Sequence, residues 1–354
     1  MTAEVKDILI VQAEAMRRFC VAACKEVRLL PEHAELLADA LVQADLRGVH
    51  THGVIMLPYY VKGYQVGGIN PRPAIEVVKE KGATAVMDGD NGLGLVVSHP
   101  AMRLAVEKAT EHGVGTVVIR SSNHYGMAAY WSMMALESDM IGYTTTNAPP
   151  NLAPWGGVTR SYGNNPISYA IPAGKEYPIV LDIAMSVVAK SKIVRAALQE
   201  EPLPTGWAMD EDGEPTTDAH IALQGLLAPI SGHKGYGIAL VNDILSGVLS
   251  GGLFGTDIPE WHAGHANRAG YSHFFMALDV AHFMPVAEFK ERIDKIVQMM
   301  KGSQLLKGQR KIYLPGELEF ETRCQRIKEG IPYSKDVIGH LKKLAQDLHI
   351  PIDI

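Results

Sequence analysis

Apolar residues near the start of the chain recur every three or four positions, which is typical of an amphipathic helix. Leu37, Leu41 and Ala44 share one helical face within the stretch 31–46. Proline at position 31 suits a first helical turn, and glycine at position 48 suits a helix end. The pattern therefore predicts a helix over residues 31–46. The polar sequence RGVHTHG that follows, residues 47–53, predicts a loop that could carry a site.

Short β-branched runs alternate with helical stretches through the middle of the chain. A hairpin is predicted over 75–90, with β-branched residues on both sides of a Lys-Gly turn. Further strands are predicted at 114–120, 141–147, 166–172, 178–184 and 272–279, and further helices at 98–112, 127–139, 186–199, 237–251, 285–301 and 334–348. This alternation predicts an α/β cofactor-binding domain at 75–283. Residues 1–74 plus 284–354 are predicted to form a separate, mostly helical domain.

The composition is that of an ordinary soluble globular protein, with 354 residues of which 47% are hydrophobic and 20% charged. The formal net charge of −6 offers no basic surface for nucleic acid or for an anionic membrane. No uncharged apolar run reaches the about 18 residues that suggest a membrane span. The N-terminal stretch carries acidic residues and no small-residue cleavage site, so we expect no signal peptide.

Cysteine usage indicates a reducing compartment. The three cysteines, Cys20, Cys24 and Cys324, are too few for a disulfide framework. Cys20 and Cys24 lie four positions apart in a helical pattern, which favours core packing. We therefore expect a cytoplasmic protein.

No glycine fingerprint of a Rossmann fold is present, because the nearest stretch, Gly92-Leu93-Gly94, has valine at position 97. The turn at Asn164-Asn165 indicates by itself only a turn. The sequence GHKGYG at 232–237 is more informative. Its glycines allow close backbone approach, Lys234 supplies charge, and a helix starting there offers N–H groups to a phosphate. A loop with a solvated lysine is the alternative.

Histidines supply the candidate acid–base groups. His50 and His52 flank Thr51 in the loop after the first long helix, and either could be a general base because imidazole titrates near neutral pH. A metal site is not favoured, since no carboxylate or cysteine lies nearby in the sequence. The alternative is a solvated loop. His262 and His265 are expected at the surface.

Two further candidates follow predicted strands. His124 lies just after the strand 114–120, where loops often line a ligand crevice. Asp182 ends the strand 178–184 and could accept a hydrogen bond from a histidine ring nitrogen. A packed polar residue and a helix N-cap, respectively, are the structural alternatives.

Seven ordered segments resemble the malate/L-lactate dehydrogenase family, which also contains ureidoglycolate, sulfolactate and 2,3-diketogulonate enzymes and the piperideine-2-carboxylate reductases. The segments are ADLRGVHTHG (44–53), SSNHYG (121–126), APWGG (153–157), YGNNPISYAIP (162–172), LDIAMSVVAKSK (181–192), GWAMDEDGEPTTD (206–218) and GHKGYGIALVNDILSGVLSG (232–251). The match runs in order over about residues 30–335 and is therefore specific to this family.

The resemblance implies a non-Rossmann NAD(P)-binding fold, a homodimer, and hydride transfer between the cofactor and a small 2-hydroxy or 2-keto acid. It assigns proton transfer to His52, oriented by Asp182, and places His124 in the same pocket as the alternative acid–base. The positions matched to cofactor contacts are Asn164, Asn165, Asp182, Ile183, Ala184, Lys234, Gly235, Pro315, Gly316 and Glu317. NAD is favoured over NADP, because no arginine cluster for a 2′-phosphate is identifiable.

Three residues depart from the family pattern. Met56 stands where the family has an arginine for the substrate carboxylate, Met185 replaces a threonine and Ser191 replaces a glycine. The first departure leaves Thr51, Met56 and Arg120 as the expected substrate contacts. It also predicts either a compensating cation, Arg47, Arg120 or Arg160, or a bulkier and more apolar substrate than malate or lactate.

Two other function classes compete with this prediction. A metal-dependent hydrolase or lyase would need a His/Glu/Asp set at helical or hairpin spacing, and none is found in the sequence. A non-catalytic binding protein of the same fold would show no change in absorbance at about 340 nm, the band of reduced nicotinamide, with any hydroxy acid.

Overall fold

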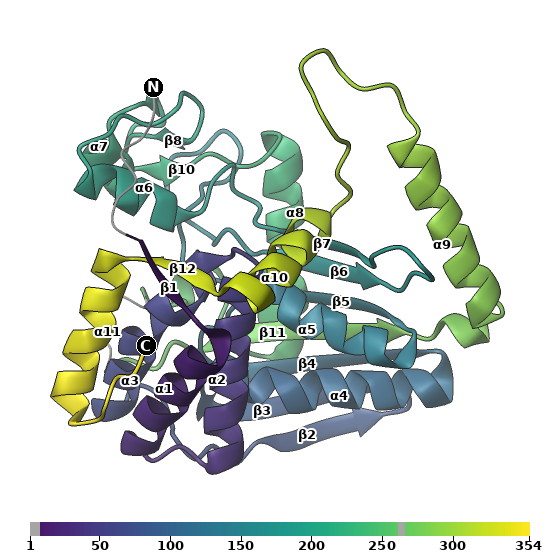
Figure 1. Cartoon of the computed structure of the whole chain (residues 1–354), viewed down its shortest axis with the longest axis horizontal. Coiled ribbons are helices and arrows are strands. Elements are labelled where there is room, and N and C mark those ends of the chain that lie inside the picture. The colour runs from purple at the N-terminus through teal and green to yellow at the C-terminus, as the bar shows by residue number, and fades with distance from the viewer. Residues whose placement is uncertain (1–7, 261–265) are drawn as a thin grey trace.

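The computed structural model of the chain describes residues 8–260 and 266–354. His262 and His265 therefore lie outside the described residues. At the centre is a mixed sheet (Figure 1) whose strands run in the order β2 (Glu76–Lys81), β3 (Thr84–Gly92), β4 (Val114–Ser122), β11 (Tyr271–Leu278), β5 (Ile141–Thr146), β6 (Ile167–Ile171) and β7 (Ile179–Ile183). Only β3 and β4 pair in parallel. Every expected strand is present, and the α/β character is confirmed.

The late strand β11 occupies the middle of this sheet. It pairs with β4 on one side and with β5 on the other, antiparallel to both. Its side chains are mostly apolar and buried, as expected for a strand covered on both faces. Strands β4 and β5 therefore lie on either side of a strand that comes much later in the chain.

Helices cover the sheet and join the two ends of the chain. Figure 1 shows α4 (Gly94–His112) and α5 (Ala128–Ser132) across one face of the sheet. The terminal helices are α1 (Ala13–Glu26), α2 (Pro31–Leu46), α3 (Leu57–Gln65), α10 (Glu317–Glu329) and α11 (Lys335–Leu348). A short antiparallel ladder, β1 (Ile8–Val11) with β12 (Ile331–Ser334), ties the first described residues to the C-terminal segment. One apolar core runs from α1, α2 and α11 into α4 and the sheet.

Several helix boundaries differ from the expected ones. The helix expected at 98–112 begins at Gly94, because the apolar turn before it is buried and Pro100 is accommodated within the helix. The helix expected at 127–139 is α-helical only to Ser132 and continues as a 3₁₀ turn, Met133–Ser138. The helix expected from 237 begins at His233 as α8 (His233–Asp243), with a π turn (Ile244–Val248) following. Buried backbone and side chains, rather than local propensity, set these ends.

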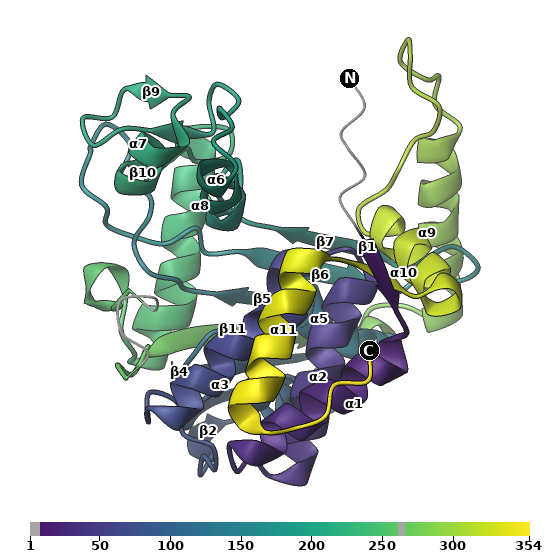
Figure 2. The same ribbon diagram turned by 60° about the vertical axis from the view of Figure 1, so that its left-hand side comes forward.

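A small three-stranded unit lies beside α8 (Figure 2); its helix α6 corresponds to the one expected at 186–199, whereas its three strands and α7 were not expected from the sequence. It contains α6 (Lys190–Leu198), β8 (Ala208–Met209), β9 (Pro215–Thr216), α7 (Ala219–Gln224) and β10 (Leu226–Leu227). Its apolar residues form a core of their own, which includes Ile193, Leu203 and Leu227. Its strands are too short to show the alternation of apolar and polar residues by which a strand is predicted.

Helix α9 (Val286–Lys301) packs at the far edge of the sheet, against the turn between β6 and β7. The carboxylate of Asp294 accepts hydrogen bonds from the N–H groups of Gly174, Lys175 and Glu176, at 2.9, 2.8 and 3.2 Å. The last helix of the chain, α11, contacts the N-terminal helices α1 and α3.

The division of the chain into two domains at residues 74 and 283 remains a prediction. Within the described residues, no helix is long and apolar enough to cross a membrane.

Candidate active site

Two of the predicted histidines meet in the folded chain. His52 lies in the histidine loop (residues 47–56), whose 3₁₀ turns, His50–His52 and Val54–Met56, connect α2 to α3. His124 follows the end of β4. Their rings stack with centroids 5.5 Å apart and an interplanar angle of 19°. The structure therefore brings together the two candidate acid–base groups, one from the terminal helices and one from the sheet.

Each of the two rings has a hydroxyl partner on its Nδ1 atom. Thr51 Oγ1 lies 2.9 Å from Nδ1 of His52. The hydroxyl of Tyr60, on α3, lies 2.7 Å from Nδ1 of His124. Burial raises the pKa of Tyr60, so its hydroxyl keeps its proton and can donate or accept in this hydrogen bond, depending on the tautomer of His124. Tyr60 was not predicted as a site residue.

Burial lowers the pKa of His52 to about 4. The ring is therefore neutral at pH 7 and has a lone pair with which to accept a proton. Such a shift is frequent at catalytic positions, where a site suppresses the charged form of the group in its resting state.

A third histidine, His273 of β11, is completely buried. Its Nε2 lies 2.7 Å from Ser122 Oγ, and its Nδ1 lies 2.7 Å from Thr146 Oγ1. Its ring also stacks on Tyr125, with centroids 4.7 Å apart. Ser122 and Tyr125 flank His124 in the sequence, so His273 holds both sides of the loop that carries His124.

His273 leads to a prediction about stability and pH. Burial lowers the pKa of His273 from 6.5 to about 3. Below about pH 6.5 His273 therefore binds a proton in the unfolded chain but not in the native state. The free energy of unfolding then falls by about 1.4 kcal/mol for each pH unit below that value. His273→Gln should flatten the fall in Tm between pH 6.5 and 4, measured by scanning calorimetry.

His52 adds to this fall, whereas Asp182 opposes it. Desolvation of its carboxylate raises the pKa of Asp182 to about 6, although the residue as a whole is exposed, and the charge of Glu319 adds to the shift, so protonation below pH 6 favours the native state. The comparison of slopes between variant and wild type removes both contributions. His340→Gln, at an exposed position of α11, is the matched control. Parallel curves for the wild type and His273→Gln would contradict the prediction.

Asp182 lies at the end of β7, and its carboxylate holds a helix. Its Oδ2 accepts a hydrogen bond of 2.8 Å from the N–H of Ala129, in the first turn of α5. This is the capping role considered for it from the sequence, although for a different helix from the one that follows. Among the described residues, no hydrogen bond joins Asp182 to His52. Its proposed role in orienting that ring stays a prediction.

His50 has both of its ring nitrogens engaged. Its Nδ1 lies 2.7 Å from Oδ1 of Asp45, and its Nε2 lies 2.8 Å from Nη1 of Arg326. Because a guanidinium can only donate, Nε2 accepts and Nδ1 carries the proton donated to Asp45. His50 is therefore a structural residue rather than a base. Across the described ranges, no group of three His, Cys, Asp or Glu side chains is arranged to hold a metal ion.

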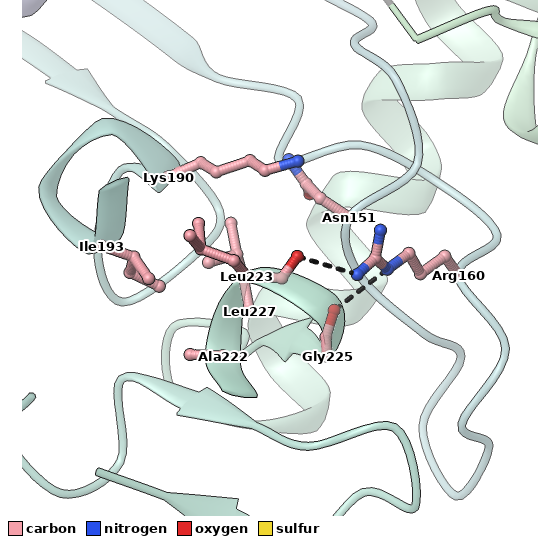
Figure 3. A pocket seen from close by; sticks show the side chains of 8 residues that line it. All are labelled: Asn151, Arg160, Lys190, Ile193, Ala222, Leu223, Gly225 and Leu227. Atoms are coloured by element: carbon pink, nitrogen blue, oxygen red, sulfur yellow. Dashed lines mark hydrogen bonds between the residues drawn. The ribbon is translucent and has the colours of Figure 1, made fainter. Parts of the chain in front are cut away.

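The three arginines expected to compensate for Met56 are all committed elsewhere. Arg120 donates to Asp88 at 3.1 Å and to the carbonyl of Ser250 at 3.3 Å. The guanidinium of Arg47 lies over the ring of Phe320, 4.4 Å from its centroid. Arg160 donates to the carbonyl groups at the end of α7, where it lines a small hollow with Asn151 and Lys190 (Figure 3). Met56 itself packs against the apolar core.

The Asn164-Asn165 turn connects α8 to the sheet. Asn165 is buried; its Oδ1 accepts from the N–H of Ala148 at 3.0 Å, and its Nδ2 donates to the carbonyl of Ala239 at 2.9 Å. The carbonyl of Asn164 accepts from the N–H of Met185 at 2.8 Å. This turn therefore fixes the end of β7 at Ile183 and the segment that follows it, beginning with Ala184, relative to α8.

The N-terminus of α8 has the features of an anion site. The helix follows Gly232, which has a φ of +62°, and begins at His233 with the exposed Lys234 next to it. Within the described residues, the N–H groups of His233 and Lys234 donate to no other group of the chain. Gly235 allows tight packing of the turn, because a Cβ there would lie 2.1 Å from the carbonyl oxygen of Ile230. These N–H groups and the ammonium fit a phosphate.

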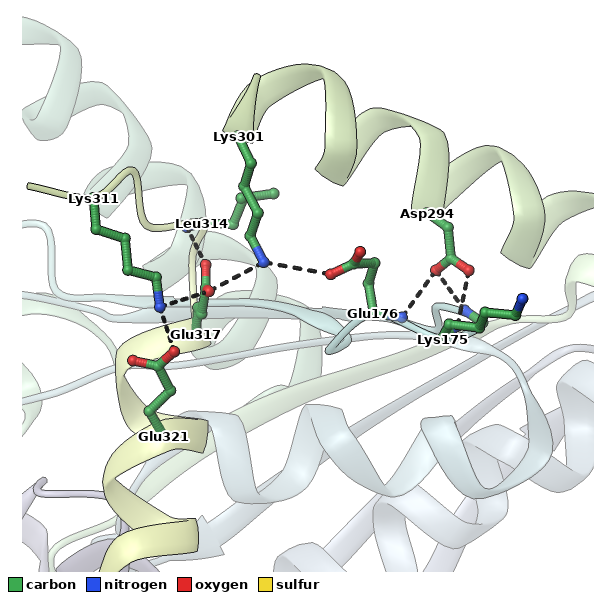
Figure 4. A network of polar contacts seen from close by, with 9 residues as sticks. Lys175, Glu176, Asp294, Lys301, Lys311, Leu314, Glu317 and Glu321 are labelled. Carbon is green, nitrogen blue, oxygen red and sulfur yellow. Dashed lines mark hydrogen bonds and ion pairs between the residues drawn. The ribbon is translucent and has the colours of Figure 1, made fainter. Parts of the chain in front are cut away.

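The segment 315–317 packs directly on β7. The carbonyl of Pro315 accepts from the N–H of Val180 at 3.0 Å, and Gly316 adopts a φ of +84° against the same residue. Glu317 is buried, with its Oε1 3.1 Å from the ammonium groups of both Lys301 and Lys311 (Figure 4). Of the two regions matched to cofactor contacts, 182–184 lies at the end of β7 and 315–317 packs against Val180 of the same strand. The carboxylate of Glu317 itself forms ion pairs with Lys301 and Lys311.

Comparisons with known proteins give one consistent result. The family model described as malate/L-lactate dehydrogenase matches residues 11–342. The malate dehydrogenase of Pyrococcus horikoshii is 41% identical over 336 residues, covering 93% of this chain and 92% of that protein. Ureidoglycolate dehydrogenase (NAD(+)) of Escherichia coli K12 is 30% identical over 325 residues, covering 92% and 91%. The solved structure of sulfolactate dehydrogenase from Methanocaldococcus jannaschii has a TM-score of 0.90 at 38% identity, covering 97% of this chain and 98% of that one.

Proposed function

Because this chain belongs to the malate/L-lactate dehydrogenase family, as its ordered motifs indicated, we propose that it is an NAD(P)-dependent dehydrogenase of a small 2-hydroxy acid. The observation that carries the proposal is the stacked pair of His52 and His124. A neutral imidazole next to a second imidazole can move a proton to or from a substrate oxygen without a metal ion. The names of the similar proteins, malate, sulfolactate and ureidoglycolate dehydrogenase, point to the same class of substrate.

The residues matched to cofactor contacts fit a dinucleotide. Lys234 and the N-terminal N–H groups of α8 fit a phosphate, while residues 182–184 at the end of β7 and residues 315–317 packed against Val180 offer further contacts. When bound, the nicotinamide ring supplies hydride chemistry. NAD is the favoured form, since one similar protein is named for its use of NAD(+). NADP remains an outcome of the assay.

The proton chemistry falls to His52. If Nδ1–H of His52 donates to Thr51 Oγ1, the Nε2 lone pair can take the hydroxyl proton of the substrate as hydride leaves the neighbouring carbon. In reverse, the imidazolium returns that proton to the carbonyl oxygen, and its charge offsets the developing alkoxide. We propose that Thr51 holds this ring in place, and that Asp182 supports the site by fixing α5. His124 is the alternative acid–base.

The proposed activity is tested by a substrate panel. Malate, lactate, sulfolactate, ureidoglycolate and their keto acids, each with NAD and NADP, should show at least one pair that changes absorbance at about 340 nm, the band of reduced nicotinamide. If no substrate changes the absorbance with either cofactor and the protein still binds the dinucleotide tightly, it is a non-catalytic binding protein of the same fold.

Lys234 is expected to hold the cofactor. Lys234→Ala should weaken the Kd for NAD about tenfold, which corresponds to about 1.4 kcal/mol, because one charge-assisted contact to a phosphate is lost. Calorimetric titration measures this effect. Lys342→Ala, at an exposed position of α11, serves as the control. A Kd equal to that of the wild type would remove Lys234 from the site.

We propose that a second copy of this chain covers the exposed face of α8. Ile238 and Val241 lie along this face and are 45% and 51% exposed. Ile244, which is 46% exposed, continues the stripe in the π turn after α8, followed by Val248 and Leu249. A contiguous apolar stripe of this kind is rare on a monomer and typical of a homodimer interface. Val241→Asp should convert a dimer into a monomer in sedimentation equilibrium, whereas Val194→Asp, on exposed α6, should not. A wild-type monomer would overturn the proposal.

A further inference from the structure

The carboxylate of Asp45, buried at the end of α2, holds both ends of the sequence Thr51-His52-Gly53. On one side of that sequence, Nδ1 of His50 donates to Oδ1 of Asp45 at 2.7 Å. On the other side, the N–H of Val54 donates to Oδ2 at 2.9 Å. The middle of the histidine loop therefore spans two hydrogen bonds to a single side chain.

Gly53 allows this close approach. A Cβ at position 53 would lie 2.0 Å from Oδ1 of Asp45, so any other residue would push the carboxylate away from the loop. Glycine is needed here for space, since its φ of −88° is one that other residues also adopt. The contact between Asp45 and the loop is thus built into the THG sequence.

The C-terminal segment supplies the remaining donors of this cluster. The hydroxyl of Tyr333, in β12, donates to Oδ2 of Asp45 at 2.9 Å. Nη1 of Arg326, near the end of α10, donates to the carbonyl of Asp45 and to Nε2 of His50, the latter at 2.8 Å. The cluster of Asp45, His50, Val54, Arg326 and Tyr333 (the Asp45 cluster) therefore joins α2 and the histidine loop to residues almost three hundred positions away.

Helix α10 connects this cluster to the segment 315–317. It begins at Glu317, directly after Gly316, which packs on Val180 of β7. It then lies along α2, where Arg323 donates to Gln43 at 2.9 Å, and it ends beside the cluster. One rigid element thus touches the proposed cofactor segment at its start and the histidine loop at its end.

We propose that Asp45 is a positioning residue for His52, and that Tyr333 and Arg326 make its geometry depend on the docking of the C-terminal segment through α10. Asp45 does not reach the reacting atoms; it acts by holding the ring of His50 on one side of His52 and the backbone N–H of Val54 on the other. The effect of Asp45 on catalysis rests on the proposed function. The structural coupling between the C-terminal segment and the histidine loop is independent of the proposed function.

Hydrogen exchange in the protein without ligand tests the structural link. Tyr333→Phe removes one hydroxyl without changing the shape of the core, and the amides of residues 49–56 should then exchange about tenfold faster. Arg326→Gln should accelerate the same amides. Tyr130→Phe is the matched control, because it removes a 2.6 Å hydrogen bond from a tyrosine to Asp39 on the same helix α2. Unchanged exchange at 49–56 in both variants would overturn the proposal.

Kinetics then separate positioning from mere stability. Tyr333→Phe should lower kcat about ten- to one-hundred-fold with little change in KM, since a small misplacement of the acid–base group slows chemistry rather than binding. Asp45→Asn should restore part of the activity that Asp45→Ala loses. A lower Tm with unchanged kcat would leave a structural role only and overturn the proposal. If the wild type neither turns over nor binds a dinucleotide, the proposed function fails, while the exchange data still decide the link.

Discussion

His52→Ala is expected to lower kcat by about 10²–10⁴-fold while the dinucleotide still binds. Alanine removes the only group at this position that can accept the substrate hydroxyl proton, and it leaves the Asp45 contacts on either side of it in place. Stopped-flow or steady-state assays at about 340 nm, with binding followed by fluorescence of the reduced cofactor, measure the two effects separately.

The matched variant for this experiment is His124→Ala. Because His124 stacks on His52 and is hydrogen-bonded to Tyr60, its loss should also slow turnover, although by less. Tyr60→Phe should resemble His124→Ala in a milder form. An active His52→Ala enzyme together with an inactive His124→Ala enzyme would reverse the two roles and leave the proposed reaction intact.

Met56→Arg is expected to improve kcat/KM for simple 2-hydroxy acids such as malate by about 10–100-fold, because a bidentate guanidinium contact to a carboxylate contributes about 1.5–3 kcal/mol. Met56 offers only a flexible apolar surface, and Arg47, Arg120 and Arg160 are held by other groups. The native substrate should therefore be bulkier or more apolar than malate or lactate. Its turnover should fall in the same variant.

The measurement is a specificity ratio between two substrates across wild type, Met56→Arg and Met56→Leu. Leucine keeps the apolar surface without a charge, so this control should leave the ratio unchanged. Ordinary efficiency of the wild type with malate or lactate would contradict the prediction and would direct the search to another cation.

The sequence predicted the elements of the sheet well, because β-branched runs bounded by turns depend on local signals. Helix α10 was missed, since among the residues of ELEFETRCQRIKE only Glu317 is buried and no apolar stripe marks a helical face. The order of the strands was not predictable either. The placement of β11 between β4 and β5 depends on pairing across more than a hundred residues.

The candidate site was predicted in part, for a related reason. His52 and His124 were recognisable because each follows the end of a regular element. The sequence analysis missed Tyr60, His273 and Asp45. They lie inside α3, β11 and α2, where nothing in the sequence distinguishes a functional polar residue from a structural one. Only the fold shows that these three hold the histidines. Met185 and Ser191, the milder departures, have no consequence that the geometry explains.

The central position of β11 has a consequence for the synthesis of the protein on the ribosome. Residues 271–278 emerge long after β4 and β5, which they join. Until then the nascent chain has two bare strand edges with unpaired N–H and C=O groups, and such edges are the usual starting point for intermolecular pairing. Folding of the sheet must therefore wait until most of the chain has left the exit tunnel. During that interval a holding chaperone would protect the yield of active enzyme more than any added native-state stability.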